Sequence, residues 1–503
     1  MIENKKRKSI RLLGIALMTM LLTFVSGGII SLPNSFLSTL SPAIAATAQH
    51  YTELDFPPLS EVKIPDYDRY QLPNGMVVYL MEDHELPLVS GMALIHTGSR
   101  LEPADKVGLA ELTGAVMRSG GTLEYSPDEL NQMLEQRAAS VETGIGTTAG
   151  NASFSALSED LPTVFKLFSK VLREPAFAPD KLELAKNQMR GGIARRNDNP
   201  GDIASREFRK LIYGPMSPYA RTVEYATLDN IQRNDLIAFY QKYFRPDNMI
   251  LGIVGDFDSE EMKALIAENF GDWRSPANVG LPEVPDASQQ QTGGVFVVDR
   301  PELTQSNILL GHLGGKLINP DYPELDVLNG VVNGFGGRLF NEVRSRQGLA
   351  YSVYGFWSPR YDYDGIFVAG GQTRSDATVP FVQAIVSELQ KLRQEPPTEA
   401  ELEYAKESIL NSFVFNFQDP SQTLSRLMRY EYYDYPSDYI FQYQQQVKAT
   451  TREDVLRVAK EYLAPEKIVV LVVGNQSQMQ PPLSSLGTQV QTVDVSIPSP
   501  PSS

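Results

Sequence analysis

The stretch Ile231-Gln-Arg-Asn-Asp-Leu236, followed by Tyr243-Phe-Arg-Pro246 and Met249-Ile-Leu-Gly-Ile-Val-Gly255, occurs twice in this chain. The second copy reads Thr450-Thr-Arg-Glu-Asp-Val455, Tyr462-Leu-Ala-Pro465 and Ile468-Val-Val-Leu-Val-Val-Gly474, at a constant offset of 219 residues. Each copy contains an amphipathic helical pattern, a proline that stops the helix, and an apolar run typical of a buried strand. The chain is therefore a tandem duplication.

Long helical patterns, such as residues 161–172 and 380–392, alternate with these strand patterns. They predict an α+β fold with two similar domains, each a β-sheet with helices packed on one face. We place the domains at residues 55–274 and 294–475, joined by a linker at 275–293 that is rich in Pro, Gln and Ser. The Pro- and Ser-rich residues 476–503 are predicted to form a disordered tail.

Composition narrows the possible functions. The chain has 503 residues, of which 42% are hydrophobic and 21% charged, as in ordinary globular proteins. It has no cysteine, which excludes disulfides, a thiol nucleophile and a thiolate metal site. Its formal net charge of −16 disfavours nucleic acid as a partner. The negative charge has two interpretations: the surface attracts basic peptides, or the charge only keeps the protein soluble.

The N-terminal residues 1–45 have the order of an export signal. Five basic residues between Lys5 and Arg11 precede an apolar run from Leu12 to Val25, and Ala43-Ile-Ala45 offers a cleavage site. Cleavage there would take the net charge from −16 to −20, because this segment carries five basic residues and one acidic residue. An uncleaved membrane anchor is the alternative, since the apolar run extends to Ile30 and approaches the length of about 20 residues that spans a bilayer. We expect an exported protein, in the periplasm or an equivalent lumen.

A glycine-rich segment stands out in the second half. It reads Asn333-Gly-Phe-Gly-Gly337-Arg-Leu-Phe-Asn-Glu-Val-Arg344-Ser-Arg-Gln-Gly348-Leu-Ala-Tyr351. The pattern predicts a loop, a helix with Leu339, Phe340 and Val343 toward the core, a helix end at Gly348 and a strand from Ala350. It lacks the lysine and the context of a nucleotide-binding loop.

Three segments of the first half, Gly98-Ser-Arg-Leu-Glu-Pro103, Gly108-Leu-Ala110 and Ser119-Gly-Gly-Thr122, carry a family resemblance. They resemble the surroundings of the inverted zinc motif in the pitrilysin, insulinase and mitochondrial processing peptidase family, and the resemblance extends over about residues 55–475. It implies two mitochondrial-processing-peptidase-like domains. The family's His-x-x-Glu-His positions are occupied here by Glu111, Gly114 and Ala115, and its third ligand, a glutamate, by Gly192.

One carboxylate cannot hold zinc, which requires three or four ligands. The chain's histidines, His50, His84, His96 and His312, include no pair at helical i, i+4 spacing. We therefore expect no cofactor bound by this chain. Glu111 alone is open to two interpretations, an acid or base in a metal-free reaction or a solvated residue in the first turn of a helix.

The resemblance assigns catalytic roles to Arg344 and Tyr351, which match an arginine and a tyrosine that reach the substrate beside the zinc. A guanidinium can hold substrate carbonyls and a phenol can donate to an oxyanion. The alternative is a helix-terminal arginine and a packed strand tyrosine. The glycines Gly334, Gly336 and Gly337 are candidates for contact with an extended peptide, or form a tight entry to the helix.

The resemblance thus implies the non-zinc subunit of a heteromeric zinc metallopeptidase. A homologous partner subunit would carry the zinc, and unfolded or extended peptides would be cut in a chamber between the two. Two alternatives remain: a catalytically silent structural or peptide-binding protein of the same fold, and a self-paired peptide holder. Only the first function requires a zinc-bearing partner.

Overall fold

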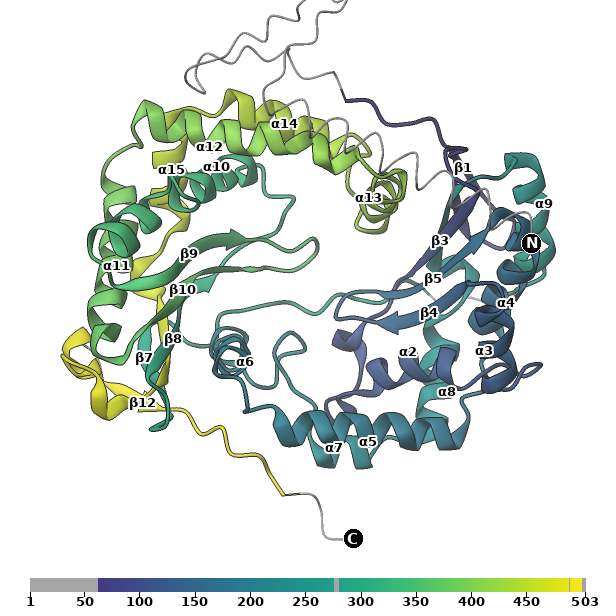
Figure 1. The fold of residues 1–503 in the computed structure, drawn as a ribbon, viewed down its shortest axis with the longest axis horizontal. Helices are drawn as coiled ribbons and strands as arrows, with labels where there is room; N and C mark the ends of the chain where they lie inside the picture. Colours follow the sequence, from purple (N-terminus) through teal and green to yellow (C-terminus); the bar gives the residue numbers. More distant parts are fainter. Residues whose placement is uncertain (1–61, 276–279, 488, 500–503) are drawn as a thin grey trace, which may run out of the picture. The chain divides into compact units, whose positions relative to one another are not determined.

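The computed structural model describes residues 62–275, 280–487 and 489–499, and Figure 1 shows their fold. The predicted signal segment, residues 1–45, and the start of the predicted first domain, residues 55–61, lie outside the described residues. Within the described ranges, no helix combines the length and the apolarity needed to cross a membrane.

Two six-stranded sheets have corresponding strand orders, β1-β2-β6-β3-β5-β4 and β12-β7-β11-β8-β10-β9. The strands of the first sheet are β1 (Asp68–Gln71), β2 (Val77–Glu82), β3 (Leu88–Ile95), β4 (Ser140–Ile145), β5 (Gly150–Leu157) and β6 (Met249–Gly255). Those of the second are β7 (Gly294–Asp299), β8 (Gln305–Leu313), β9 (Ala350–Ser358), β10 (Ile366–Arg374), β11 (Val469–Gly474) and β12 (Val490–Thr492). In both sheets the strand from the sequence repeat, β6 or β11, lies between a parallel and an antiparallel neighbour.

The helices also form two sets, one before the linker and one after it. Those before the linker are α2 (Leu109–Ser119), α3 (Pro127–Glu135), α4 (Leu161–Arg173), α5 (Pro179–Arg195), α6 (Pro200–Tyr213), α7 (Tyr225–Asp229), α8 (Arg233–Tyr243) and α9 (Ser259–Phe270). Those after it are α10 (Tyr322–Val332), α11 (Thr378–Gln394), α12 (Glu399–Ser412), α13 (Pro420–Tyr432), α14 (Tyr439–Ala449) and α15 (Arg452–Tyr462), with a π-helical segment η6 (Phe340–Arg346).

The repeated sequence folds alike in both copies. Helices α8 and α15 each begin with a capping box, formed by Gln232 with Asp235 and by Thr451 with Asp454. Such a box satisfies backbone N–H groups that the first helical turn leaves unpaired. A short 3-10 turn after each helix then leads into the buried strand. The duplication read from the sequence is confirmed.

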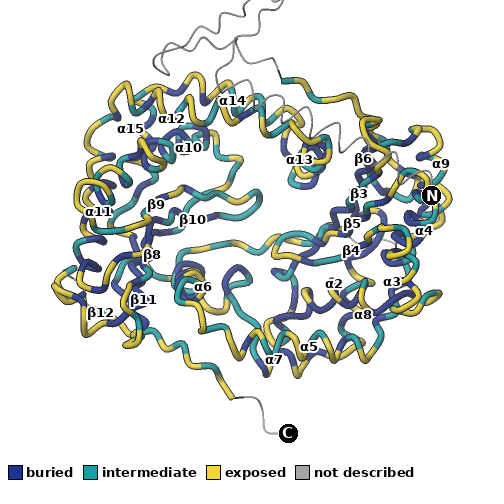
Figure 2. The backbone as a smooth tube through the Cα atoms, in the orientation of Figure 1, coloured by how far each residue is buried: buried dark blue, intermediate teal, exposed yellow. Residues whose placement is uncertain are grey.

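Strands β6 and β11 are buried along their whole length, whereas β5 and β9 keep exposed residues; Figure 2 colours the backbone by this burial. Along β6, Leu251 and Ile253 join the core that the sheet forms with its own helices, whereas Ile250 and Val254 join a smaller cluster on the opposite face. Strand β11 divides in the same way. This is the α+β architecture that the sequence predicted, with each sheet's own helices on one face.

The opposite face of each sheet is covered by a helix from the other half of the chain. We call these two helices, α6 and α13, the exchanged helices. Helix α6, from the first half, packs Ile203, Phe208 and Ile212 against β8 and β11 of the second sheet. Helix α13, from the second half, packs Leu424 and Met428 against β6 and its neighbours in the first sheet. Each of these two hydrophobic clusters therefore contains residues from both halves of the chain.

The prediction of a disordered tail from residue 476 is wrong for the described residues 476–487 and 489–499. Strand β12 pairs parallel to β7 and completes the edge of the second sheet. Beyond it, Val493 and Val495 pack on the cluster that also contains α6, and Ile497 packs on the core of the first half. Alternation of apolar and polar residues in this segment was the sequence signal for a strand.

Candidate functional site

Helix α2 carries three of the four positions that correspond to the zinc motif. Its N-terminus is held by Glu102, whose buried carboxylate accepts the backbone N–H of Gly108 at 3.2 Å and of Ala110 at 2.9 Å. A carboxylate at this end satisfies unpaired amides and favours the positive end of the helix dipole. Arg221 donates to the carbonyl oxygens of Ser99 and Glu102 and fixes the preceding turn. Sequence reasoning saw Glu102 only as part of the resemblance and missed its role as a cap, and it did not identify Arg221.

The position of the family's catalytic glutamate is closed by the fold. A Cβ atom at Gly114 would lie 2.6 Å from the backbone nitrogen of Ile145 and 2.8 Å from the carbonyl carbon of Gly144. Both neighbours belong to β4, and the Thr143 hydroxyl donates to the Gly114 carbonyl at 2.6 Å. Strand β4 therefore occupies the space that a glutamate side chain would need.

The remaining positions supply a single carboxylate. Ala115 and Gly192 are exposed, and a Cβ atom at Gly192 would meet nothing within 4 Å. Glu111 is also exposed, although partial desolvation by surrounding atoms raises the pKa of its carboxyl. No group of three or more potential metal ligands occurs among the described residues. These residues do not fit a zinc ion.

Histidines His84 and His96 have separate surroundings. His84 lies between Asp256, at 2.7 Å, and Glu82, whose hydrogen bonds raise the pKa of the ring. His96 stacks on Tyr432 with ring centroids 4.0 Å apart. Burial lowers the pKa of His96 to about 4, so the ring is neutral at physiological pH. His84 and His96 therefore have different neighbours, and no recorded contact in the described chain joins the two rings.

In the second half, the structure brings Arg344 and Tyr351 into contact. The Arg344 guanidinium carbon lies 5.0 Å from the centre of the Tyr351 ring and 4.6 Å from that of Phe340. These are cation–π distances. Arg344 comes from η6 and Tyr351 from the start of β9, while Leu339 and Val343 are buried beneath them. Tyr351 is 83% exposed, so the packed-aromatic alternative does not describe it.

The glycine-rich loop lies against α12. Gly334 has a φ of +78°, a conformation that L side chains rarely adopt, and the N–H of Gly336 donates to the Tyr404 hydroxyl at 3.4 Å. A Cβ atom at Gly337 would meet the Asn333 carbonyl at 2.0 Å. Glycine is therefore required for the tight entry to η6.

Side chains fasten the same loop to α12. Arg338 forms a bidentate ion pair with Glu401, with nitrogen–oxygen distances of 2.7 and 3.0 Å. Neither Tyr404 nor Glu401 was predicted as part of this site. In the described chain, no hydrogen bond, ion pair or ring contact joins Arg344 or Tyr351 to Glu111.

Both halves match known protein families. Residues 77–216 match the family described as insulinase (peptidase family M16), and residues 230–409 match the peptidase M16 inactive domain. An uncharacterized zinc protease of Mycobacterium leprae is 26% identical, covering 72% of this chain and 82% of its own length. Another, of Mycobacterium bovis, is 27% identical, covering 79% and 90% respectively.

Solved structures share the fold. The crystal structure of a peptidase M16 inactive domain from Pseudomonas fluorescens has a TM-score of 0.75 at 25% identity, covering 83% of this chain and 100% of that chain. A protease from Helicobacter pylori has a TM-score of 0.70 at 20% identity, which shows likeness of fold alone. Because the two sequence matches together span more than half of the chain and the duplicated fold agrees, this protein belongs to the insulinase family, peptidase family M16.

Proposed function

We propose that this chain is the non-zinc subunit of a heteromeric zinc peptidase. The contrast between its two halves supports the proposal. The first half has lost the zinc ligands and has closed the position of the catalytic glutamate, whereas the second half presents Arg344 and the exposed Tyr351 side by side. A zinc-bearing homologous subunit would supply the activated water for hydrolysis of an extended peptide.

The chemistry proposed for this chain is binding and charge stabilisation. The Tyr351 hydroxyl can donate to the oxyanion that forms when water attacks a peptide carbonyl. The Arg344 guanidinium keeps its positive charge and has N–H donors for substrate carbonyls, while the faces of Phe340 and Tyr351 restrict its position. The glycine-rich loop, held to α12 by the Arg338–Glu401 ion pair, supports this surface.

The first test is assembly with a zinc-bearing partner, identified by pull-down from the source cell and assayed for peptide cleavage. In the active mixture, Tyr351→Phe should lower turnover by on the order of 10² to 10³, or about 2.7–4 kcal/mol, because it removes one oxyanion donor. Arg344→Ala should also raise KM, since its contacts exist in the ground state. Arg346→Ala is a matched control, because Arg346 is 74% exposed and, among the described residues, its ion pair is with Glu342.

Assembly must be measured alongside turnover, by size-exclusion chromatography of each variant mixture. Loss of pairing with unchanged activity per intact complex would mean that Arg344 and Tyr351 are structural. Normal cleavage by both variants would reject the shared active site and leave the catalytically silent structural or peptide-binding function.

A further inference from the structure

The exchanged helices carry a second repeat, Ser-Arg-x-x-Arg. It reads Ser205-Arg206-Glu-Phe-Arg209 in α6 and Ser425-Arg426-Leu-Met-Arg429 in α13, and both helices begin at a proline five residues before the serine. The first arginine of each motif is structural. Arg206 donates to the Asn197 side chain at 2.7 Å, and Arg426 donates to the Asn416 side chain at 2.8 Å.

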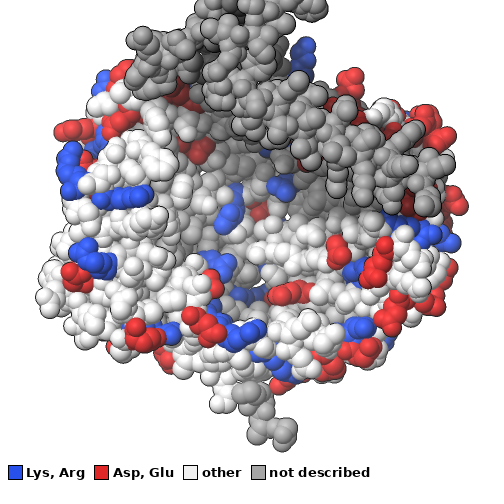
Figure 3. Space-filling model, viewed as in Figure 1, with Lys and Arg blue, Asp and Glu red and all other residues white. Residues whose placement is uncertain are grey.

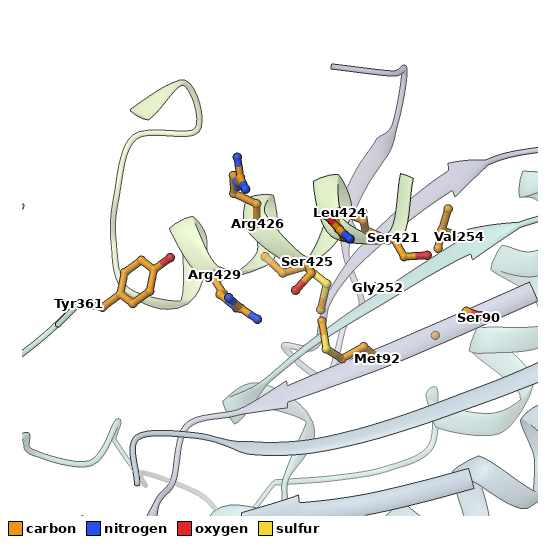
Figure 4. Close-up of a pocket in the computed structure, with 13 residues that line it drawn as sticks. Ser90, Met92, Gly252, Val254, Tyr361, Ser421, Leu424, Ser425, Arg426 and Arg429 are labelled. Carbon is orange, nitrogen blue, oxygen red and sulfur yellow. The ribbon is translucent and has the colours of Figure 1, made fainter. Parts of the chain in front are cut away.

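The second arginines, Arg209 and Arg429, line one cavity of about 550 Å³. Its base includes Asn151 and Ser153 of β5. Figure 4 draws an adjoining pocket that shares Met92, Tyr361 and Arg429 with this cavity. It shows Arg429 extending from α13 between the other two residues, whereas Arg426 points away from the strands. Equivalent positions of the two repeats thus face the same space.

A third arginine reaches this cavity from the turn between β9 and β10. Arg360 and Tyr361 lie in this turn, next to Asp362, which forms an ion pair with Arg100 of the first half at 2.7 Å. Tyr361 stacks on Tyr433 with ring centroids 4.5 Å apart. The turn is therefore held in place, and its arginine is added to the pair from the helices. We call the space lined by Arg209, Arg360 and Arg429 the basic cavity.

The three guanidinium groups of the basic cavity have no direct partner within the described chain. In residues 62–275, 280–487 and 489–499, none of its three guanidinium groups forms an ion pair or a side-chain hydrogen bond, and the lining carboxylate Asp362 is already paired with Arg100. Burial raises the pKa of Tyr213, and among the nearby charges Arg360 and Arg209 act to lower it while Asp364 acts to raise it, which places two cations and one carboxylate near this ring. Figure 3 shows Lys and Arg side chains in the hollow of this face, although the chain as a whole is acidic.

We propose that the basic cavity binds an acidic peptide segment through its carboxylates. Guanidinium groups bind carboxylates in bidentate geometry, and three of them around one space suit a segment with two or more negative side chains. The volume lies in the range of ligand sites, and the side chains of Asn151 and Ser153 offer hydrogen bonds to a peptide backbone. This inference rests on the proposed function in one respect: that function is the reason to expect a peptide as the ligand. The surface of a chain with net charge −16 would by itself favour basic peptides.

The test is fluorescence anisotropy on the isolated full-length chain, without any partner. The probes are fluorescein-labelled 12-residue Gly/Ser peptides that carry three Glu, three Gln or three Lys. We expect the Glu peptide to bind at least tenfold more tightly than the other two, and salt to weaken it. Each of Arg209→Gln, Arg360→Gln and Arg429→Gln should weaken it about tenfold, which corresponds to one lost charged contact.

Arg374→Gln is the matched control, because it removes the same charge from an exposed arginine that pairs with Asp376 outside the basic cavity. It should leave binding unchanged. Equal affinity for the Glu and Gln peptides would overturn the proposal, as would unchanged binding by all three cavity variants. Displacement of the Glu peptide by inorganic phosphate at equal concentration would show a small-anion site instead of a peptide site.

The two proposals can fail separately. If the isolated chain binds the Glu peptide tightly but the pull-down recovers no zinc-bearing subunit, only the proposed subunit role is rejected. Cleavage that depends on Arg344 and Tyr351, in a chain that does not discriminate the Glu peptide, would reject only the acidic ligand.

Discussion

At the scale of single residues, two glycines show how differently the lost zinc positions are embedded. Gly114 is buried under β4, and its carbonyl accepts the Thr143 hydroxyl. Gly192 is exposed on α5, and a Cβ atom added there would have no other atom within 4 Å. Replacing the ligands alone would therefore not restore the site, because one of the four positions has no room for a side chain.

This contrast predicts opposite effects of the same substitution. Gly114→Ala should lower the free energy of unfolding by about 1–3 kcal/mol, because the new methyl overlaps the backbone of Gly144 and Ile145. Gly192→Ala should raise it by about 0.5–1 kcal/mol, because alanine is the better helix former at an open helical position. Chemical denaturation of both variants measures the two changes. A harmless Gly114→Ala would mean that β4 yields easily and that the position is not closed.

At the scale of elements, the sequence predicted helices and strands well where a short segment with a regular apolar pattern defined them. The helical pattern at residues 161–172 became α4 (Leu161–Arg173), and the strand expected from Ala350 begins there as β9. Leu339 and Val343 are buried as expected, whereas Phe340, also expected to face the core, is half-buried and packs against Phe335 and Arg344. The segment forms the π-helical η6, whose faces a 3.6-residue periodicity does not describe. The contact of Arg344 with Phe340 and Tyr351 depends on side-chain packing between elements, which periodicity does not specify.

The tail was misread because its composition outweighed its pattern. Its Pro- and Ser-rich ends suggested disorder, but Val493, Val495 and Ile497 alternate with exposed residues along an extended segment. The backbone of Val493 donates to Val297 of β7 at 2.8 Å, and Asn197 donates to the Val495 carbonyl at 2.6 Å. These partners come from distant parts of the sequence, so their contacts could not be read from the tail alone.

The tail should therefore contribute to stability. Val493→Ser combined with Val495→Ser should lower the free energy of unfolding by about 1–3 kcal/mol, since both half-buried side chains lose apolar contacts. Gln491→Ser is the control, because Gln491 is exposed on β12. Thermal denaturation of the two variants is the measurement, and equal melting temperatures would show that the tail adds nothing to the fold.

At the scale of the whole molecule, the exchange of α6 and α13 is the feature that the sequence did not predict. An amphipathic helix indicates that one face is buried but not which sheet will cover it. The basic cavity depends on this exchange, because Arg209 and Arg429 approach each other only when each helix packs on the sheet of the other half. The sequence repeat contained both arginines, and their shared location became visible only in three dimensions.

The contact between the halves also includes a buried ion pair, Arg100 with Asp362, whose side chains are only 5% and 18% exposed. Asp362→Asn should lower the free energy of unfolding by about 3–5 kcal/mol, because it leaves the guanidinium of Arg100 buried without its counter-charge. Asp376→Asn is the control, since the Arg374–Asp376 pair is exposed and worth at most about 1 kcal/mol. The double variant Arg100→Met with Asp362→Leu separates charge from packing: it should recover most of the lost stability, because apolar side chains of similar volume leave no unpaired charge. Chemical denaturation measures all three, and an Asp362→Asn variant as stable as its control would mean that this ion pair does not hold the halves together.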